Sequence, residues 1–173
     1  DWLQAELPCP TGGLVDAVTG PVFLEHALLA AGELPAAGAD GAIHLPPALL
    51  FHVGHSVPGQ AAVSFDPETV PVGLVLHGPN LPFPPGVYDI VLSYAVSAGN
   101  AESPNIFRVV TLPENRLLAE VPLDPAADSL VVPAVSLGVD PVRLEFHYAA
   151  AGSLVLRDIR LAPATLRLRP AAP

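Results

Sequence analysis

The chain has 173 residues, enough for one domain with a single well-buried core. Hydrophobic residues make up 51% and the mean hydropathy is +0.49, which excludes overall disorder, yet no apolar run approaches the roughly 18 residues of a membrane-spanning helix. The net charge is −10 and all seven basic residues are arginine. Without a basic stripe, the composition argues against nucleic acid as a partner and against direct membrane insertion.

The first twenty residues lack periodicity and are expected to form a short N-terminal extension or a linker remnant. Because the chain starts without an initiator methionine or a signal peptide, we expect it to be part of a longer protein. Its single cysteine excludes an internal disulfide. A strand is expected at Val22–Leu29, although Phe23–Leu34 could instead form a helix that ends at Gly32 and Pro35.

From residue 42 onward, short apolar stretches are separated by turn residues at intervals of about 8–12 residues. Within Val87–Val96, apolar side chains occupy every second position, which predicts a half-buried antiparallel strand. The 22 prolines fall mostly between such stretches and argue against a helical fold. The predicted strands are Ala42–Leu45, Leu49–Val53, Ala61–Phe65, Val72–His77, Val87–Val96, Asn105–Leu112, Arg116–Pro122, Ser129–Leu137, Val142–Ala149 and Leu154–Leu161. The pattern predicts an all-β antiparallel sandwich.

Three stretches carry a more specific signal. Gly78–Tyr88 (GPNLPFPPGVY) is a proline-rich turn that enters a strand, Arg116–Leu123 (RLLAEVPL) suits a hairpin, and Val142–Tyr148 pairs with Ser153–Leu161 as closing strands. Together these stretches resemble the galactose-binding-like jelly roll, the fold of many bacterial carbohydrate-binding modules. The resemblance covers about half of the chain, from residue 78 to residue 161.

The resemblance implies a jelly-roll β-sandwich over residues 21–165, with a Pro/Ala tail at 166–173. It also implies a non-catalytic carbohydrate-binding or accessory module of a larger bacterial cell-envelope or polysaccharide-handling protein, for example a glycosyltransferase. The expected partners are a glycan or other domains of the parent protein, and a cell-envelope or extracellular location is favoured. The alternative is a structural or assembly sandwich that contacts proteins through a sheet face and has no sugar site.

In many modules of this type, carboxylates on the first and last strands hold a structural calcium ion. The resemblance therefore implies Asp158 and Glu25 as calcium ligands, within the set of 6–8 oxygens that this cation takes. The alternative is that Asp158 forms a surface ion pair with a nearby arginine.

The best candidates for ligand binding are polar residues that share one face of a sheet. Arg143, Glu145 and His147 alternate along one predicted strand, and Arg108 and Asp89 are expected on the same side of neighbouring strands. Such a set could hydrogen-bond a glycan or an acidic sugar, or it could simply be a solvated face.

Aromatic residues are only 6% of the chain, and most alternate with apolar partners, which predicts core packing. Trp2 and Phe83 are less clearly committed to the core. His52 and His55 form an H-x-x-H pattern that could share a zinc ion only if the chain turned at Gly54; otherwise they are loop histidines.

The chain contains no nucleophile elbow, zinc-protease motif or phosphate-binding loop. We therefore expect a domain that is not itself an enzyme. A hydrolase would need two carboxylates among Asp89, Asp158, Glu120 and Glu145 to face each other across a pocket.

Overall fold

The computed structural model describes residues 34–97 and 104–164 of the chain, and this part consists of strands and one 3-10 turn. The elements are β1 (Ile43–His44), η1 (Pro47–Leu49), β2 (Phe51–His52), β3 (His55–Ser56), β4 (Val63–Phe65), β5 (Gly73–Pro82), β6 (Gly86–Val96), β7 (Ile106–Thr111), β8 (Arg116–Pro122), β9 (Ser129–Leu137), β10 (Pro141–Tyr148) and β11 (Leu154–Pro163). The expected strand at 22–29, the extension at 1–20 and the tail at 166–173 lie outside the described residues. Within the described ranges, no helix has the length and apolarity that a membrane crossing requires.

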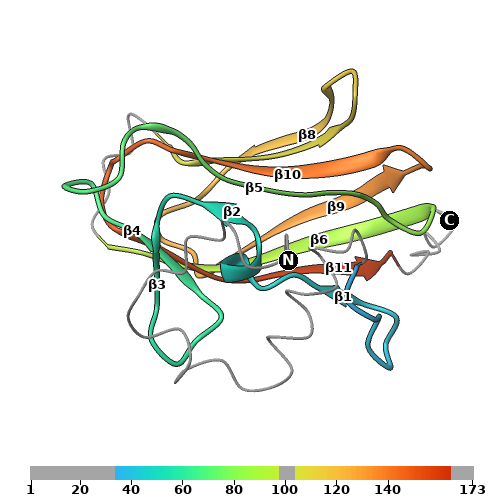
Figure 1. Ribbon diagram of the computed structural model, residues 1–173, viewed down its shortest axis with the longest axis horizontal. Helices are drawn as coiled ribbons and strands as arrows, with labels where there is room; N and C mark the ends of the chain where they lie inside the picture. Colours follow the sequence, from blue (N-terminus) through green and yellow to red (C-terminus); the bar gives the residue numbers. More distant parts are fainter. Residues whose placement is uncertain (1–33, 98–103, 165–173) are drawn as a thin grey trace, which may run out of the picture.

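The strands form two antiparallel sheets that lie face to face (Figure 1). One sheet has the order β3-β4-β11-β6-β9, with β1 also paired to β11. The other has the order β2-β5-β10-β7-β8. In Figure 1, β5, β10 and β8 run along the upper side of the molecule, and β6 and β11 along the lower side.

The connectivity of the eight longer strands defines the fold. From β4 to β11 the chain builds the four-strand rows β4-β11-β6-β9 and β5-β10-β7-β8, one in each sheet. This is the order of a jelly roll, in which two Greek keys wrap around a common core. The strand order confirms the predicted jelly-roll β-sandwich.

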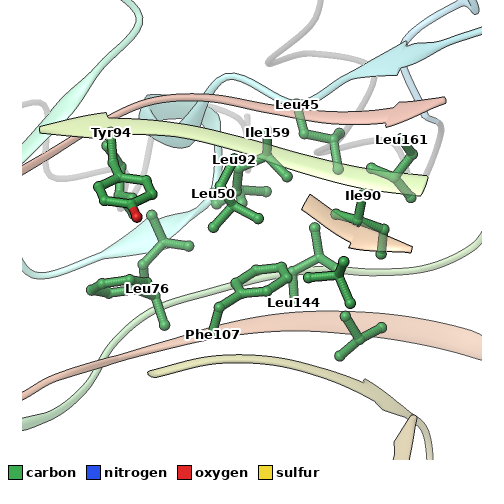
Figure 2. Close-up of a cluster of buried hydrophobic side chains, with 14 of the residues drawn as sticks. Leu45, Leu50, Leu76, Ile90, Leu92, Tyr94, Phe107, Leu144, Ile159 and Leu161 are labelled. Carbon is green, nitrogen blue, oxygen red and sulfur yellow. The ribbon is translucent and has the colours of Figure 1, made fainter. Parts of the chain in front are cut away.

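The core lies between the two sheets and follows from the period-two pattern of the strands. On β6, Tyr88, Ile90, Leu92 and Tyr94 are buried, while the residues between them are more exposed. Figure 2 shows Leu76, Phe107 and Leu144 of the five-stranded sheet facing residues of the other sheet such as Leu92 and Ile159. The core positions predicted for the aromatic residues of β6 and β10 are therefore confirmed.

Phe83 also belongs to the core, with 2% of its surface exposed, whereas Trp2 lies outside the described residues. Phe65 stacks on Phe146 across the two sheets with ring centroids 5.8 Å apart. Aromatic contacts of this kind add to the burial of apolar surface.

The proline-rich turn predicted within Gly78–Tyr88 is shorter than expected, because β5 continues to Pro82 and β6 begins at Gly86. This strand pairs with β10 on one side, but on its other side β2 pairs only with Leu76 and His77. A proline lacks the N–H that a central strand would need, but it is tolerated where the neighbouring edge is open. The prolines of this segment therefore fit an edge strand as well as they fit a turn.

Gly54 marks the point where the chain leaves one sheet for the other. β2 precedes it in the five-stranded sheet, and β3 follows it in the six-stranded sheet. A Cβ atom at this position would lie 2.5 Å from the backbone oxygen of Ser64 on β4. Only glycine fits such a close approach of two backbones.

Candidate functional site

The outward face of β10 carries three polar side chains at alternate positions. Arg143, Glu145 and His147 point away from the core, while the residues between them are buried in it. The Glu145 side chain is only 8% exposed, because its neighbours on the same face cover it. A carboxylate this buried must be paired if it is to stay ionised.

Glu145 has two partners on its own strand. The Arg143 guanidinium donates from Nε to Oε1 at 2.7 Å, and its Nη2 lies 2.6 Å from the same oxygen. The His147 Nε2 atom lies 3.1 Å from Oε2. Both carboxylate oxygens are thus engaged, and the three side chains hold one another in place.

Pairing between strands extends this group into a row across the whole sheet. Glu145 of β10 lies opposite His77 of β5 on one side and Arg108 of β7 on the other. His77 in turn lies opposite Phe51 of β2, and Arg108 lies opposite Glu120 of β8. We call Phe51, His77, Glu145, Arg108 and Glu120 the transverse row. Because neighbouring strands are about 4.8 Å apart, it is roughly 19 Å long.

A hollow of about 330 Å³ lies at the β8 end of the transverse row. Its lining is Arg108, Val110, Asn115, Leu117, Glu120, Arg143 and Glu145. Arg108 donates from Nε to Glu120 Oε2 at 2.6 Å, so charged groups are paired within the lining. The hollow combines donors, acceptors and an apolar portion formed by Val110 and Leu117.

Asn115 fixes the second arginine of the hollow. It lies in the turn between β7 and β8 with a left-handed backbone (φ +54°), a conformation that asparagine adopts more readily than most residues. Its Oδ1 atom accepts a hydrogen bond from Nη2 of Arg143 at 2.9 Å. Arg143 is therefore held between Glu145 and Asn115 before any ligand arrives.

An exposed aromatic ring occupies the other end of the transverse row. Phe51 is 63% exposed and stacks on His77, with ring centroids 4.7 Å apart and planes inclined by 29°. Burial lowers the pKa of His77, Arg143 lowers it further and Glu145 partly offsets this. The His77 ring is thus uncharged at neutral pH and supports Phe51 as a flat platform.

Two effects act against each other on the pKa of Glu145. Burial raises it, but the hydrogen bonds and the charges of His147 and Arg143 together outweigh burial and hold the pKa below its usual value of 4.5. The carboxylate therefore stays ionised throughout the neutral range.

This lowered pKa predicts an acid-dependent loss of stability. A carboxyl group with a depressed pKa in the folded state stabilises the fold above its unfolded pKa, and that contribution disappears as the pH falls through the folded value. We expect Glu145→Gln to be less stable than the wild type at neutral pH, and the difference to shrink below about pH 4.5. Urea unfolding between about pH 6 and about pH 3 measures this, and a constant difference would contradict it.

The structure does not bring Asp89 to this face, so the prediction that it lies on the same side of the sheet as Arg143 and Arg108 was wrong. Asp89 belongs to β6 in the other sheet, where its Oδ1 accepts the backbone N–H of Ala134 at 2.9 Å. Ala134 has a left-handed backbone (φ +55°), so Asp89 stabilises an irregular position in β9.

Of the two predicted calcium ligands, Asp158 alone lies in the part of the chain that the structure describes. Asp158 lies on β11 with its Oδ2 atom 3.3 Å from His44 Nδ1, a histidine partner rather than the arginine considered as the alternative. Glu25 lies outside the described residues, so the calcium site stays a prediction. In the described ranges, no three His, Cys, Asp or Glu side chains are grouped closely enough to hold a metal ion.

The two histidines of the H-x-x-H pattern lie in different sheets. His52 Nδ1 contacts the Gly54 carbonyl at 3.1 Å, and His55 Nε2 lies 3.2 Å from the Thr69 hydroxyl. The chain does turn at Gly54, but each histidine has a local polar partner there. The interpretation as loop histidines was wrong, because both residues lie in short strands, β2 and β3.

The members of the site that were not identified from the sequence are Phe51, His77, Val110, Asn115 and Leu117. Phe51, His77 and Asn115 lie in segments with no alternating polar pattern. Only strand register places Phe51 and His77 in line with Glu145.

No protein-family model and no curated protein matches the sequence. Solved structures similar to this chain include the C-terminal CBM6 of LamC, a laminarinase from Zobellia galactanivorans (15% identity, 70% of this chain and 98% of that chain, TM-score 0.45). They also include TmCBM61 in complex with β-1,4-galactotriose (11% identity, 79% of this chain and 94% of that chain, TM-score 0.38). A third is the insecticidal crystal protein Cry2Aa (12% identity, 76% of this chain and 22% of that chain, TM-score 0.49). Carbohydrate-binding modules are thus among the structures to which the chain is similar, and at these identities the likeness concerns the fold.

Proposed function

We propose that the outer face of the five-stranded sheet binds a carbohydrate without catalysis. The observation that carries this proposal is the transverse row, which connects an exposed aromatic ring to a hollow lined by paired charges. A sugar chain presents apolar C–H faces and many hydroxyl groups, so it needs both kinds of contact.

Each part of the row has a role in this proposal. Phe51 offers its free face for stacking against a sugar ring. In the hollow, the carboxylates accept hydrogen bonds from sugar hydroxyls and the guanidinium groups donate hydrogen bonds to them. The ion pairs and Asn115 already fix the side chain of Arg143. Preorganised groups lose little conformational entropy on binding, which favours affinity.

The carboxylates of the hollow suit binding better than hydrolysis. Glu120 and Glu145 both line it, but an arginine is paired with each of them. A glycosidase needs one carboxyl group with a raised pKa as its general acid, whereas the pKa of Glu145 is lowered. This favours a domain that is not itself an enzyme.

The setting that we propose is an accessory module of a larger bacterial cell-envelope or polysaccharide-handling protein, such as a glycosyltransferase. It is supported by the resemblance of residues 78–161 to galactose-binding-like modules. The partners would be a glycan and other domains of the parent protein.

The alternative function, an assembly domain, has its own support in the structure. Val53 after β2, Val72 before β5 and Leu74 of β5 are exposed, as is Phe51 of β2. Exposed apolar side chains on paired strands can contact another protein. A glycan array of the purified chain, with light scattering to detect self-association, distinguishes the two functions.

The stacking role of Phe51 leads to a prediction. We expect Phe51→Ala to weaken binding to an array-selected glycan about fivefold, since a stacked ring is worth about 1 kcal/mol, and Phe51→Tyr to retain it. Isothermal titration calorimetry measures both. Val131→Ala, an exposed apolar position on the other sheet, should match the wild type. Equal affinities of Phe51→Ala and the wild type would remove Phe51 from the site.

A further inference from the structure

The charges of the hollow are balanced pair by pair. Arg108 lies 2.6 Å from Glu120, and Arg143 lies 2.6 Å from Glu145. Two guanidinium groups and two carboxylates thus leave no uncompensated positive charge within the lining of the hollow. The second guanidinium also bonds to Asn115, a neutral acceptor.

A negatively charged sugar would meet an unfavourable environment in this hollow. To pair with Arg143, the carboxylate of a uronic acid would have to compete with Glu145, which is ionised and 8% exposed. A buried carboxylate that loses its partner carries a large desolvation cost. Pairing with Arg108 would likewise place two negative groups beside one guanidinium, because Glu120 is already there.

Neutral hydroxyl groups face no such conflict. Among the described residues, Arg108 makes its side-chain hydrogen bond through Nε only, so its two Nη groups are left to donate to a ligand. A carboxylate oxygen can accept a second hydrogen bond from a hydroxyl without losing its arginine. A polyol can therefore add to the existing pairs instead of breaking them.

The charge of the whole chain acts in the same direction. Its net charge is −10, which repels a polyanion during approach. The repulsion is strongest at low ionic strength, since physiological salt screens exposed charges beyond about 8 Å.

We propose that this site selects neutral glycans and discriminates against acidic ones such as uronic-acid polymers. The proposal rests on the carbohydrate-binding function and defines its ligand class. Its basis is the local pairing of both arginines, which converts two potential anion sites into sites for hydroxyl groups.

Matched polymers test this selection. The probes are polygalacturonate, alginate and hyaluronan, each compared with its carboxyl-reduced neutral form, together with an array that contains neutral and acidic glycans. We expect the hits on the array to be neutral glycans. For any polymer of which either form binds, we expect the carboxyl-reduced form to bind at least tenfold more tightly than the acidic form at low ionic strength. An acidic polymer that binds more tightly than its reduced form would overturn the proposed selection but keep a glycan site. Binding to no glycan at all would instead overturn the proposed function.

One variant tests the local mechanism separately from the net charge. Glu120→Gln leaves Arg108 without its carboxylate, so the ratio of acidic to neutral affinity should rise at least fivefold, with salt-sensitive binding of the acidic form. Glu68→Gln makes the same change in net charge outside the hollow and should leave the ratio as in the wild type. Equal shifts in both variants would show that net charge decides the preference and would overturn the role of the pairing.

Discussion

Gly54→Ala is expected to lower the free energy of unfolding by about 3 kcal/mol, the upper part of the range for overpacking. The added methyl group would lie 2.5 Å from the Ser64 oxygen, 2.7 Å from Val63 Cγ1 and 2.8 Å from Phe65 Cδ1. These atoms cannot move aside easily, because Val63 and Phe65 are fully buried and β4 is hydrogen-bonded to β11. Urea unfolding followed by circular dichroism measures the loss.

Gly138→Ala is the matched control for this substitution. A Cβ atom there would meet no atom within 4 Å, and its backbone is not left-handed. We expect its stability to lie within about 0.5 kcal/mol of the wild type. If the two alanine variants were equally stable, the close approach of β4 to the crossing between the sheets would not be a constraint on the fold.

Arg143→Ala is expected to weaken glycan binding about 30-fold, which corresponds to about 2 kcal/mol. The substitution removes donors from the hollow and leaves Glu145 with His147 as its remaining close partner. The carboxylate is then less well compensated and less well positioned for a ligand hydroxyl. Calorimetric titration with the array-selected glycan gives the affinity.

Arg116→Ala is the control for Arg143→Ala, since it also removes one arginine but lies outside the hollow. Its affinity for the glycan should equal that of the wild type. Circular dichroism of both variants separates a loss of binding from a loss of fold. A folded Arg143→Ala variant with wild-type affinity would place the glycan elsewhere on the molecule.

The alternation of residue types was sufficient to predict much of the fold. The bounds of β8 and β9 agree with the predicted strands, β6 differs by one residue at one end, and β7 and β10 differ by one residue at each end. In β6 and β10 apolar side chains recur every second residue, and a strand is the conformation that places such residues on one face. Among the described strands, β3 at His55–Ser56 escaped prediction, because two residues are too few to show a repeat.

Part of the candidate site could be predicted for the same reason. Arg143, Glu145 and His147 share a face because they are two residues apart on one strand, a relation that is local in sequence. The placement of Asp89 failed because it required knowing which sheet β6 joins. Consecutive strands of a jelly roll can enter opposite sheets, and nothing near Asp89 in the sequence specifies that choice.

The sequence by itself determined the strand class, the inward and outward faces of the longer strands and the polar set on β10. The tertiary structure alone decided the strand register, and with it the row from Phe51 to Glu120 and the hollow beside it. The physical reason is that side-chain alternation acts within one strand, whereas register results from backbone hydrogen bonds and core packing between segments far apart along the chain.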